Sequence, residues 1–372
     1  MASRLAHRHI ALQWSYRISS QPSTSQTRPA RIFARCIHIF RDIPPLRQHR
    51  RQLLLNGDTL GFVPTLGALH HGHLCLIRAA AAENSKVIVS IYLNPTQFGV
   101  TEDLNSYPKT WDTDVAQLRA LDAELARTHG AGRIEAIFAP TTKAMYPTSP
   151  PDSTIPGVGS FITLTPLGTL LEGASRPVFF RGVATVCMKL FNIVQPERVY
   201  FGQKDVQQTV VIRRLVTDFH LDTLVRVCPT EREPDGLAMS SRNVYMGQRR
   251  RKVSVVLSQA LRAAEAAYGM GRRERGDILA LAWDVANRMV MEQEALGEAE
   301  RAGIEVDYFS LADPDSMEEV EVVDGERGAV LSCAIKMLPL EVTKPGEVLG
   351  LGEDKVPVRL IDNIILQPQR PS

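Results

Sequence analysis

The stretch Pro64-Thr65-Leu66-Gly67-Ala68-Leu69-His70-His71-Gly72-His73 decides how this chain is expected to fold. It follows the apolar residues 60–63 and precedes the apolar run 74–82, which indicates a turn between a strand and a helix. Gly67 and Gly72 allow a sharp turn and the close approach of a ligand, and the unpaired N–H groups at the start of a helix form an anion site. We therefore predict a phosphate-binding turn.

Two histidines give this turn its predicted chemistry. His70 and His73 are three residues apart, so at the start of a helix both imidazoles face the same ligand. A simpler interpretation makes one histidine a helix cap and leaves the other in solvent, but a pair around a glycine at such a turn favours phosphate recognition. Zinc is a further alternative because His71 is adjacent. No Cys or carboxylate with ligand-like spacing completes a zinc set, so no protein metal site is predicted.

The composition is that of a globular protein large enough for two domains, with 372 residues of which 44% are hydrophobic and 23% are charged. No apolar run reaches membrane-spanning length, so no membrane partner is expected. The five cysteines form no C-x-x-C pair, so neither a disulfide framework nor a cysteine-rich zinc site is predicted.

The positive charge is confined to the N-terminal end. Residues 1–41 hold seven arginines and no acidic residue, and the rest of the chain is net acidic. The leader, residues 1–35, has the composition of a mitochondrial transit peptide and equally that of a disordered extension. We expect a cytoplasmic protein, or a mitochondrial one if the leader is a transit peptide. Nucleic acid is not predicted as a partner.

Beyond Leu60, short apolar runs alternate with helix-like segments, which predicts a Rossmann-like α/β fold: a parallel sheet with helices on both faces. The predicted strands are 60–63, 87–93, 134–138 and 198–201, and the predicted helices are 74–82, 112–126, 180–190 and 209–217.

After Tyr245 the composition changes, and a smaller C-terminal α+β domain is predicted with two helices within 253–291 and strands at 306–311 and 329–335. The predicted organisation is therefore a leader over residues 1–35, a nucleotide-binding domain over 36–228 and a lid-like domain over 229–372. A second domain of this kind is able to close over a bound nucleotide.

Polar residues follow the predicted strands at two further places. Asn94 and Gln97 follow the strand 87–93, and Gly202-Gln203-Lys204-Asp205-Val206-Gln207-Gln208 follows the strand 198–201. Ligands of open α/β sheets bind beyond the carboxyl ends of the strands, so these turns should lie beside the histidine turn.

The residue types at these places suit a nucleotide. A lysine and a carboxylate, Lys204 and Asp205, suit a phosphate and a ribose hydroxyl. Further along, Ser240, Ser241 and Arg242 offer two hydroxyls and a guanidinium to a polyphosphate. A helix cap would explain one serine but not the arginine.

Taken together, these stretches resemble the pantoate-β-alanine ligase family of the nucleotidyltransferase superfamily with the His-x-Gly-His signature. The match runs from about Gly61 to Asn363 and ends in Arg359-Leu360-Ile361-Asp362-Asn363. The resemblance implies that pantoate attacks the α-phosphate of ATP, that β-alanine attacks the resulting pantoyl adenylate, and that pantothenate, AMP and pyrophosphate are released. It also implies Mg²⁺ bound with ATP, no protein metal ligand, and a homodimer.

The resemblance assigns roles to individual residues. The implied catalytic residues are His70, His73, Lys204 and Arg242. The implied ATP-binding residues are Pro64, Thr65, Leu66, Gly67, His70, His73, Gly202, Lys204, Asp205, Glu231, Met239, Ser240, Ser241 and Arg242. The implied pantoate-binding residues are Leu66, Asn94, Gln97, Arg176 and Gln208, and Lys189 matches a further pocket position.

Four residues depart from the family pattern. Leu66 replaces the usual Met at similar volume, Gln203 replaces Glu, and His71 replaces an acid or Ala. Phe179 stands where the family usually has a pocket histidine, so one polar contact near the substrate is expected to be lost. The segments Thr148–Pro166 and Met337–Lys355 are longer than usual and are interpreted as additions specific to this lineage.

Two other functions fit parts of the pattern. The first is a nucleotidyltransferase of the same superfamily with a different acceptor, against which the two glutamines Gln97 and Gln208 count because they suit a small polyol acid. The second is a non-catalytic nucleotide-binding protein, for which Phe179 is the only support.

Overall fold

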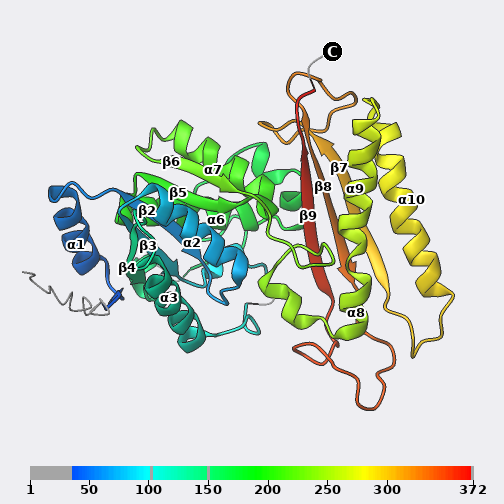
Figure 1. Ribbon diagram of the computed structural model, residues 1–372, viewed down its shortest axis with the longest axis horizontal. Helices are drawn as coiled ribbons and strands as arrows, with labels where there is room; N and C mark the ends of the chain where they lie inside the picture. Colours follow the sequence, from blue (N-terminus) through cyan, green and yellow to red (C-terminus); the bar gives the residue numbers. More distant parts are fainter. Residues whose placement is uncertain (1–35, 101–103, 149–150, 370–372) are drawn as a thin grey trace, which may run out of the picture. The chain divides into compact units, whose positions relative to one another are not determined.

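The computed structural model describes residues 36–100, 104–148 and 151–369, and the predicted leader lies outside these ranges. The described chain contains a six-stranded parallel sheet and a three-stranded antiparallel sheet (Figure 1). None of the helices in the described ranges combines the length and the apolarity that a membrane span needs.

The parallel sheet has the strand order β1-β4-β3-β2-β5-β6. Its strands are β1 (His38–Phe40), β2 (Leu60–Thr65), β3 (Lys86–Ile91), β4 (Arg133–Phe138), β5 (Arg198–Gly202) and β6 (Leu224–Cys228). Consecutive residues of the central strands, such as Phe62 and Val63, are fully buried on opposite faces, which explains their uninterrupted apolar runs. From β2 the chain adds strands first toward β4 and then, from β5, in the other direction. The switch point of the sheet therefore lies between β2 and β5.

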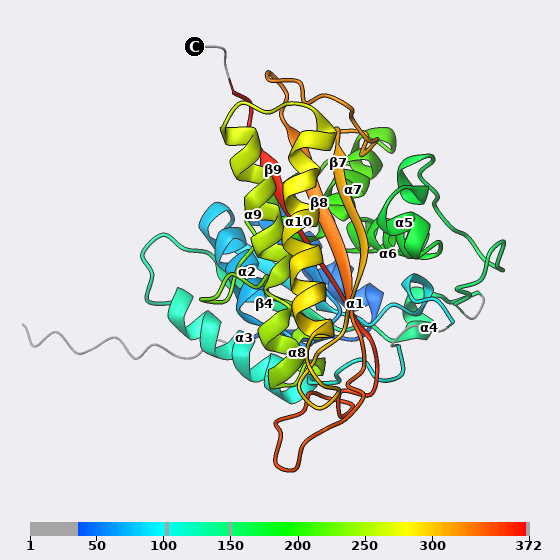
Figure 2. The same ribbon diagram turned by 90° about the vertical axis from the view of Figure 1, so that its right-hand side faces the viewer.

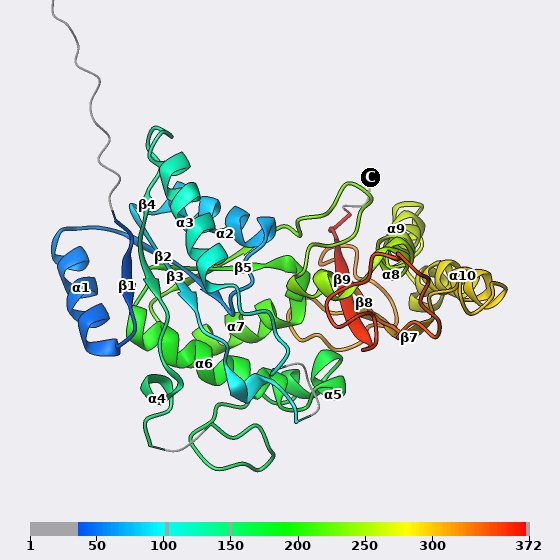
Figure 3. The same cartoon turned by 90° about the horizontal axis from the view of Figure 1, so that it is seen from below.

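Helices cover both faces of this sheet (Figure 3). On one face lie α2 (His71–Glu83) and α3 (Trp111–Leu125), and on the other lie α1 (Ile43–Leu55), α6 (Phe179–Val194) and α7 (Val206–Asp218). The short helices are α4 (Thr142–Met145), α5 (Glu172–Ser175), and the 3₁₀ turns η1 (Pro95–Gln97), η2 (Leu167–Thr169), η3 (Gln203–Asp205) and η4 (Ser241–Tyr245). The Rossmann-like fold predicted from the alternating pattern is confirmed.

A glycine sets the distance between α6 and the turn after β3. A Cβ on Gly182 would lie 2.4 Å from the carbonyl oxygen of Thr96 and 2.5 Å from the backbone nitrogen of Gln97. Only glycine therefore lets the helix approach this turn so closely. The close packing fixes Gln97 relative to the sheet.

The antiparallel sheet has the order β7-β8-β9, and α9 and α10 cover one of its faces (Figure 2). The helices and strands of this C-terminal part are α8 (Gln248–Val253), α9 (Val256–Gly269), α10 (Arg275–Glu294), β7 (Ile304–Ala312), β8 (Ala329–Met337) and β9 (Val358–Leu366). Side chains alternate along β9: Val358 and Leu360 pack into the core under the helices. The intervening residues of β9 therefore face the parallel sheet.

The sequence predicted the central strands of the parallel sheet and the strands β7 and β8, but it missed the edge strands β1, β6 and β9, the helix α1 and the short helices α4, α5 and α8. β1 has only 3 residues, and α1 carries two prolines and four arginine or histidine side chains among its 13 residues. The smaller C-terminal sheet confirms the predicted α+β architecture. The division of the chain at residues 228 and 229 stays a prediction.

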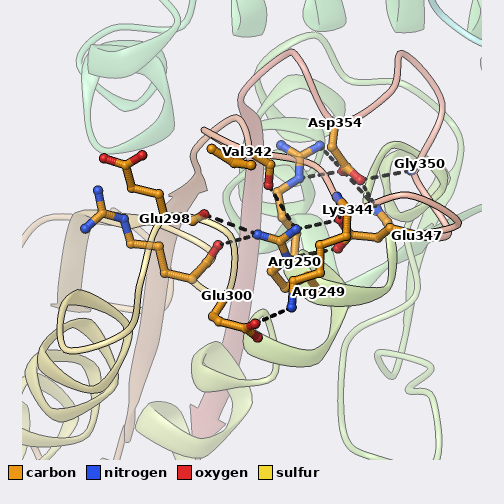
Figure 4. Close-up of polar contacts among 11 residues, drawn as sticks. Arg249, Arg250, Glu298, Glu300, Val342, Lys344, Glu347, Gly350 and Asp354 are labelled. Atoms are coloured by element: carbon orange, nitrogen blue, oxygen red, sulfur yellow. Dashed lines mark hydrogen bonds and ion pairs between the residues drawn. The ribbon is translucent and has the colours of Figure 1, made fainter.

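The long segment between β8 and β9 is held by two neighbouring arginines of α8 (Figure 4). Arg249 donates to the Glu347 carboxylate, from Nε at 2.9 Å, and to the carbonyl of Val342. Arg250 is fully buried, pairs with the buried Asp354 at 2.6 Å, and donates to the carbonyl of Tyr245. The segment between β8 and β9 is therefore bonded to α8 through residues in both of its halves.

We predict that Arg250→Met destabilises the fold by about 3–5 kcal/mol, because it leaves the carboxylate of Asp354 buried without its partner. Arg301→Met is the matched control, since its partner Glu341 is half exposed and the pair is surface-located. Urea unfolding followed by circular dichroism measures both variants. A loss for Arg250→Met no larger than that of the control would contradict this prediction.

Candidate active site

A cavity of about 1000 Å³ opens at the switch point, beyond the carboxyl ends of β2 and β5. Its wall includes the turn after β2, the turn after β5, the segment 229–245 and residues of β9. The predicted site residues that line it are Pro64, Thr65, Leu66, His70, His73, Gln97, Arg176, Gly202, Lys204, Asp205, Gln208, Glu231, Met239, Ser240, Ser241 and Arg242. The four turns singled out in the sequence thus share one cavity.

Two predicted residues lie behind this wall. Gly67 has a φ of 90°, and a Cβ there would lie 3.2 Å from a carboxylate oxygen of Asp114, so it shapes the turn. Asn94 is fully buried and donates to Oε1 of Gln97 at 3.0 Å. Asn94 therefore orients Gln97 instead of lining the cavity.

The carboxylate of Asp114 holds the signature turn. It accepts from the backbone N–H groups of Ala68 at 3.0 Å and Leu69 at 2.9 Å. It is almost fully buried at the start of α3. Its role depends on a contact across 46 residues, which the local pattern does not reveal.

Both signature histidines bond to the backbone at the start of α2. Nδ1 of His70 accepts from the N–H of Gly72 at 3.2 Å, and Nδ1 of His73 accepts from the N–H of His70 at 3.3 Å. A ring nitrogen that accepts carries no proton, so each neutral ring has its proton on Nε2. The two rings lie 4.1 Å apart. Helix capping and ligand binding, the two alternatives weighed for the sequence, are therefore compatible, because each uses a different nitrogen.

The surroundings keep both histidines neutral. Burial, followed by the charge of Lys204, lowers the pKa of His70 to about 4. Burial, followed by His70 and Lys204, lowers the pKa of His73 to about 3. At neutral pH each ring is thus a neutral Nε2–H donor beside a lysine.

The turn after β5 is held from the side of β9. Nδ2 of Asn363 donates to the carbonyls of Gln203 and Lys204, both at 2.9 Å. Nε2 of Gln203 donates back to Oδ1 of Asn363 at 3.2 Å. Gln203, which stands where the family pattern has Glu, therefore supplies an amide that donates to Asn363 of β9. Lys204 itself lies 3.7 Å from the carboxylate of Asp205.

The two serines have different hydrogen-bond partners. Ser240 caps η4, where its hydroxyl accepts from the N–H of Arg242 at 3.2 Å. The Ser241 hydroxyl is hydrogen-bonded to Tyr107 at 3.0 Å. A nearby arginine, Arg232, binds the Asp362 carboxylate of β9 with distances of 2.6 and 2.9 Å. The segment that carries these serines is therefore bonded to the loop before α3 and to β9 of the antiparallel sheet.

Phe179, which stands where the family pattern has histidine, also lines the cavity. The Arg176 guanidinium lies over the Phe179 ring at 3.8 Å and donates to the carbonyl of Gln97 at 3.4 Å. The Phe179 ring therefore stacks on the guanidinium of Arg176, which also lines the cavity. Lys189 does not line the cavity, because its Nζ donates to the carbonyl of Met145 at 3.0 Å.

A buried ionic cluster joins the loop before α6 to the antiparallel sheet. Arg359 of β9 binds the Glu172 carboxylate, with 2.7 Å from Nη2 to Oε1, and binds Asp307 at 2.7 Å. The Tyr308 hydroxyl donates to Glu172 at 2.9 Å. The sequence reasoning quoted Arg359 only as the end of the resemblance and did not identify this cluster. Partners separated by 187 residues leave no local signal.

His71 has two neighbours that the sequence spacing did not reveal. The structure brings Cys75 and Glu231 to it, with the three ligand atoms all within 4.8 Å of one another. The expectation that no Cys or carboxylate completes a set of potential zinc ligands is therefore wrong at this position. The spacing misleads because Glu231 lies far along the chain and approaches α2 only in the fold.

Comparison with known proteins supplies a family. The sequence model of the pantoate-beta-alanine ligase family matches residues 38–365. A pantothenate synthetase of Roseiflexus sp. (strain RS-1) is 46% identical over 279 residues, which cover 75% of this chain and 88% of that protein. A pantothenate synthetase of Roseiflexus castenholzii is 44% identical over 308 residues, which cover 83% and 92%.

Solved structures give the same result. The crystal structure of a pantothenate synthetase from Thermus thermophilus has a TM-score of 0.68 and 33% identity, covering 88% of this chain and 99% of that chain. The pantoate-beta-alanine ligase of Francisella tularensis, complexed with beta-gamma ATP and beta-alanine, has a TM-score of 0.62 and 28% identity, covering 90% and 100%.

We predict that the two signature histidines stay neutral at pH 5 in the ligand-free protein. Their folded pKa values, about 4 and about 3, lie below the ordinary 6.5, so the folded chain binds fewer protons than the unfolded chain. Their contribution to the free energy of unfolding is therefore full above pH 6.5 and is lost as the pH falls toward these values. NMR titration of labelled histidines measures this, and a midpoint near 6.5 for either ring would contradict it.

Proposed function

This chain belongs to the pantoate-β-alanine ligase family, and we propose that it joins pantoate to β-alanine, forming pantothenate at the expense of ATP. In the first proposed step a carboxylate oxygen of pantoate attacks the α-phosphorus of ATP, and pyrophosphate leaves. In the second step the amine of β-alanine attacks the acyl carbon of pantoyl adenylate, and AMP leaves with that oxygen. The amide bond of pantothenate forms as the acyl–oxygen bond breaks.

One observation carries the proposal: two neutral Nε2–H donors and Lys204 meet in a cavity at the switch point of the sheet. Because the positions of His70 and His73 are fixed by backbone hydrogen bonds, they are oriented before any ligand binds. Donors arranged in advance stabilise charge that develops in a transition state without reorganisation. We assign them to the oxygens of the α-phosphate during attack.

The remaining polar wall suits the rest of the nucleotide and the acid. Lys204, Ser240, Ser241 and Arg242 are assigned to the other phosphates, since guanidinium and ammonium groups bind phosphate oxygens well. The carboxylate of Asp205 is assigned to the ribose. No side chain has to act as nucleophile, because the pantoate carboxylate already is one, so catalysis consists of positioning and charge stabilisation.

Pantoate is assigned to Gln97, Gln208 and Arg176, which all line the cavity. Gln97 is held by Asn94 and by the close packing at Gly182, so its amide is fixed for recognition of a hydroxy acid. Arg176, stacked on Phe179, supplies a positive charge that attracts the carboxylate. The loss of one polar contact at Phe179 stays a prediction, and the retained Arg176, Gln97 and Gln208 support a catalytic homologue.

The site fits ATP that carries its own Mg²⁺. The histidine, lysine and arginine side chains assigned to the phosphates are donors that bind phosphate oxygens, so the ion would be held chiefly by the phosphates and water. Neutralisation of phosphate charge is what Mg²⁺ supplies when it is bound with ATP. A homodimer remains part of this proposal.

ATP–pyrophosphate exchange tests the proposed function. We expect exchange that depends on pantoate, because only the adenylate step is reversible without β-alanine. Exchange that requires another acceptor would support a different nucleotidyltransferase, and absence of exchange with any acceptor would support a non-catalytic nucleotide-binding protein.

We predict that His73→Ala lowers the rate of pantoate-dependent exchange by about 10²–10³-fold, the usual effect of losing one transition-state donor. ATP affinity should change by less than about tenfold, because the donor acts mainly in the transition state. His129→Ala, at an exposed turn, is the control and should leave both quantities unchanged. Near-normal exchange by His73→Ala would refute the assigned role.

Two adjacent glutamines give a matched pair for the pantoate site. Gln208 lines the cavity, so Gln208→Ala should raise the pantoate KM about tenfold or more without changing the melting temperature. Gln207 is buried and bonds to Leu167, Leu170 and Glu172, so Gln207→Ala should lower the melting temperature. Steady-state kinetics and thermal unfolding separate the two. An effect of Gln208→Ala confined to the ATP KM would contradict the assignment.

A further inference from the structure

Three potential metal ligands meet at the edge of the cavity, next to the signature turn. Nε2 of His71 lies 3.4 Å from Sγ of Cys75, one helical turn further along α2. A carboxylate oxygen of Glu231 completes the group, with all three ligand atoms within 4.8 Å of one another. The approach of Glu231 to α2 is seen independently at Gly72, where a Cβ would lie 3.8 Å from Cβ of Glu231.

The spacing and chemistry of the group suit a tetrahedral ion. In a zinc site with bonds of about 2.0–2.3 Å, neighbouring ligand atoms are about 3.5 Å apart, and the Cys75–His71 distance already has this value. One thiolate and one carboxylate together neutralise the charge of a divalent cation, and imidazole is a neutral third ligand. Zn²⁺ accepts this mixture of sulfur, nitrogen and oxygen ligands.

We propose that His71, Cys75 and Glu231 form a binding site for one Zn²⁺ ion, with water as the fourth ligand. Binding replaces the thiol proton of Cys75, which is released to the buffer as the zinc–sulfur bond forms. Arg78 is a cation close to the thiol, but its guanidinium is engaged by Glu124, with two distances of 2.9 Å. The site is separate from the phosphate donors, since it uses the histidine between them.

An ion bound to Glu231 would also affect the segment that leads into Ser240. The carbonyl of Glu231 accepts from the N–H of Met239 at 2.9 Å, and Arg232 pairs with Ala238, so residues 231–239 form a hairpin that leads into Ser240. An ion held by both α2 and Glu231 ties this hairpin to the signature turn and occupies a carboxylate that lines the cavity. We expect Zn²⁺ to inhibit the reaction, an expectation that rests on the proposed function, whereas ion binding itself does not.

Co²⁺ is the spectroscopic probe for this site, because a Co²⁺–thiolate bond gives a charge-transfer absorption that carboxylate or imidazole ligands do not. The reduced, metal-free full-length chain should bind one equivalent of Co²⁺ with this absorption, and Zn²⁺ should displace it. Titration calorimetry in two buffers of different ionisation enthalpy should show the release of a proton.

Substitutions of the proposed ligands test which side chains bind the metal ion. Cys75→Ser should abolish the absorption, and His71→Ala should weaken Zn²⁺ binding by about 100-fold or more, since loss of a direct ligand costs at least as much as loss of its supporting contacts. Cys36→Ser removes an exposed thiol elsewhere and should retain the signal. Circular dichroism establishes that each variant is folded.

Two results would overturn the proposal. One is a wild-type protein without the charge-transfer absorption, and the other is an absorption that survives in folded Cys75→Ser. Because these measurements require neither ATP nor pantoate, they succeed or fail independently of the proposed ligase activity.

Discussion

The site depends on one pair of contacts, the hydrogen bonds from backbone N–H groups to Nδ1 of His70 and of His73. They satisfy donors that every helix leaves unpaired at its start, and they fix the protons of both rings on Nε2. The same residues thus terminate the turn and present donors to a ligand. Asp114 supports this arrangement by holding the backbone just before the first histidine. Loss of the Asp114 carboxylate would therefore change the geometry of this turn without removing either of the histidine donors.

The cavity is built from segments that are remote in sequence. The parallel sheet supplies the turns after β2 and β5 because its strand order reverses between them. The antiparallel sheet supplies a further part of the wall through β9, where Asn363 donates to the carbonyls of the turn after β5 and Arg359 binds Glu172. These contacts hold the turn after β5 and the helix α5, both of which line the cavity. Any movement of one sheet against the other therefore changes the site.

The local pattern was sufficient for the fold class and for the location of the cavity, whereas wall residues such as Arg176 and Met239 were assigned only through the family resemblance. Periodicity predicted the central strands, and glycine and histidine at a strand-to-helix turn predicted where ligands approach. The contacts that the local pattern did not predict share one physical cause. Asp114, Arg359 and Glu231 act through partners far along the chain, and a single sequence carries no record of such pairings. Asn94 was placed in the wall although it is buried behind Gln97, because a turn position does not tell which of two amides points outward.

The central claim is that a pantoate carboxylate oxygen becomes bonded to the α-phosphorus of ATP in this cavity. Pantoate labelled with ¹⁸O in its carboxylate tests this directly, with the products of a complete reaction analysed by mass spectrometry. We expect one ¹⁸O atom in each AMP released. Pantothenate formed without transfer of the label to AMP would contradict the claim.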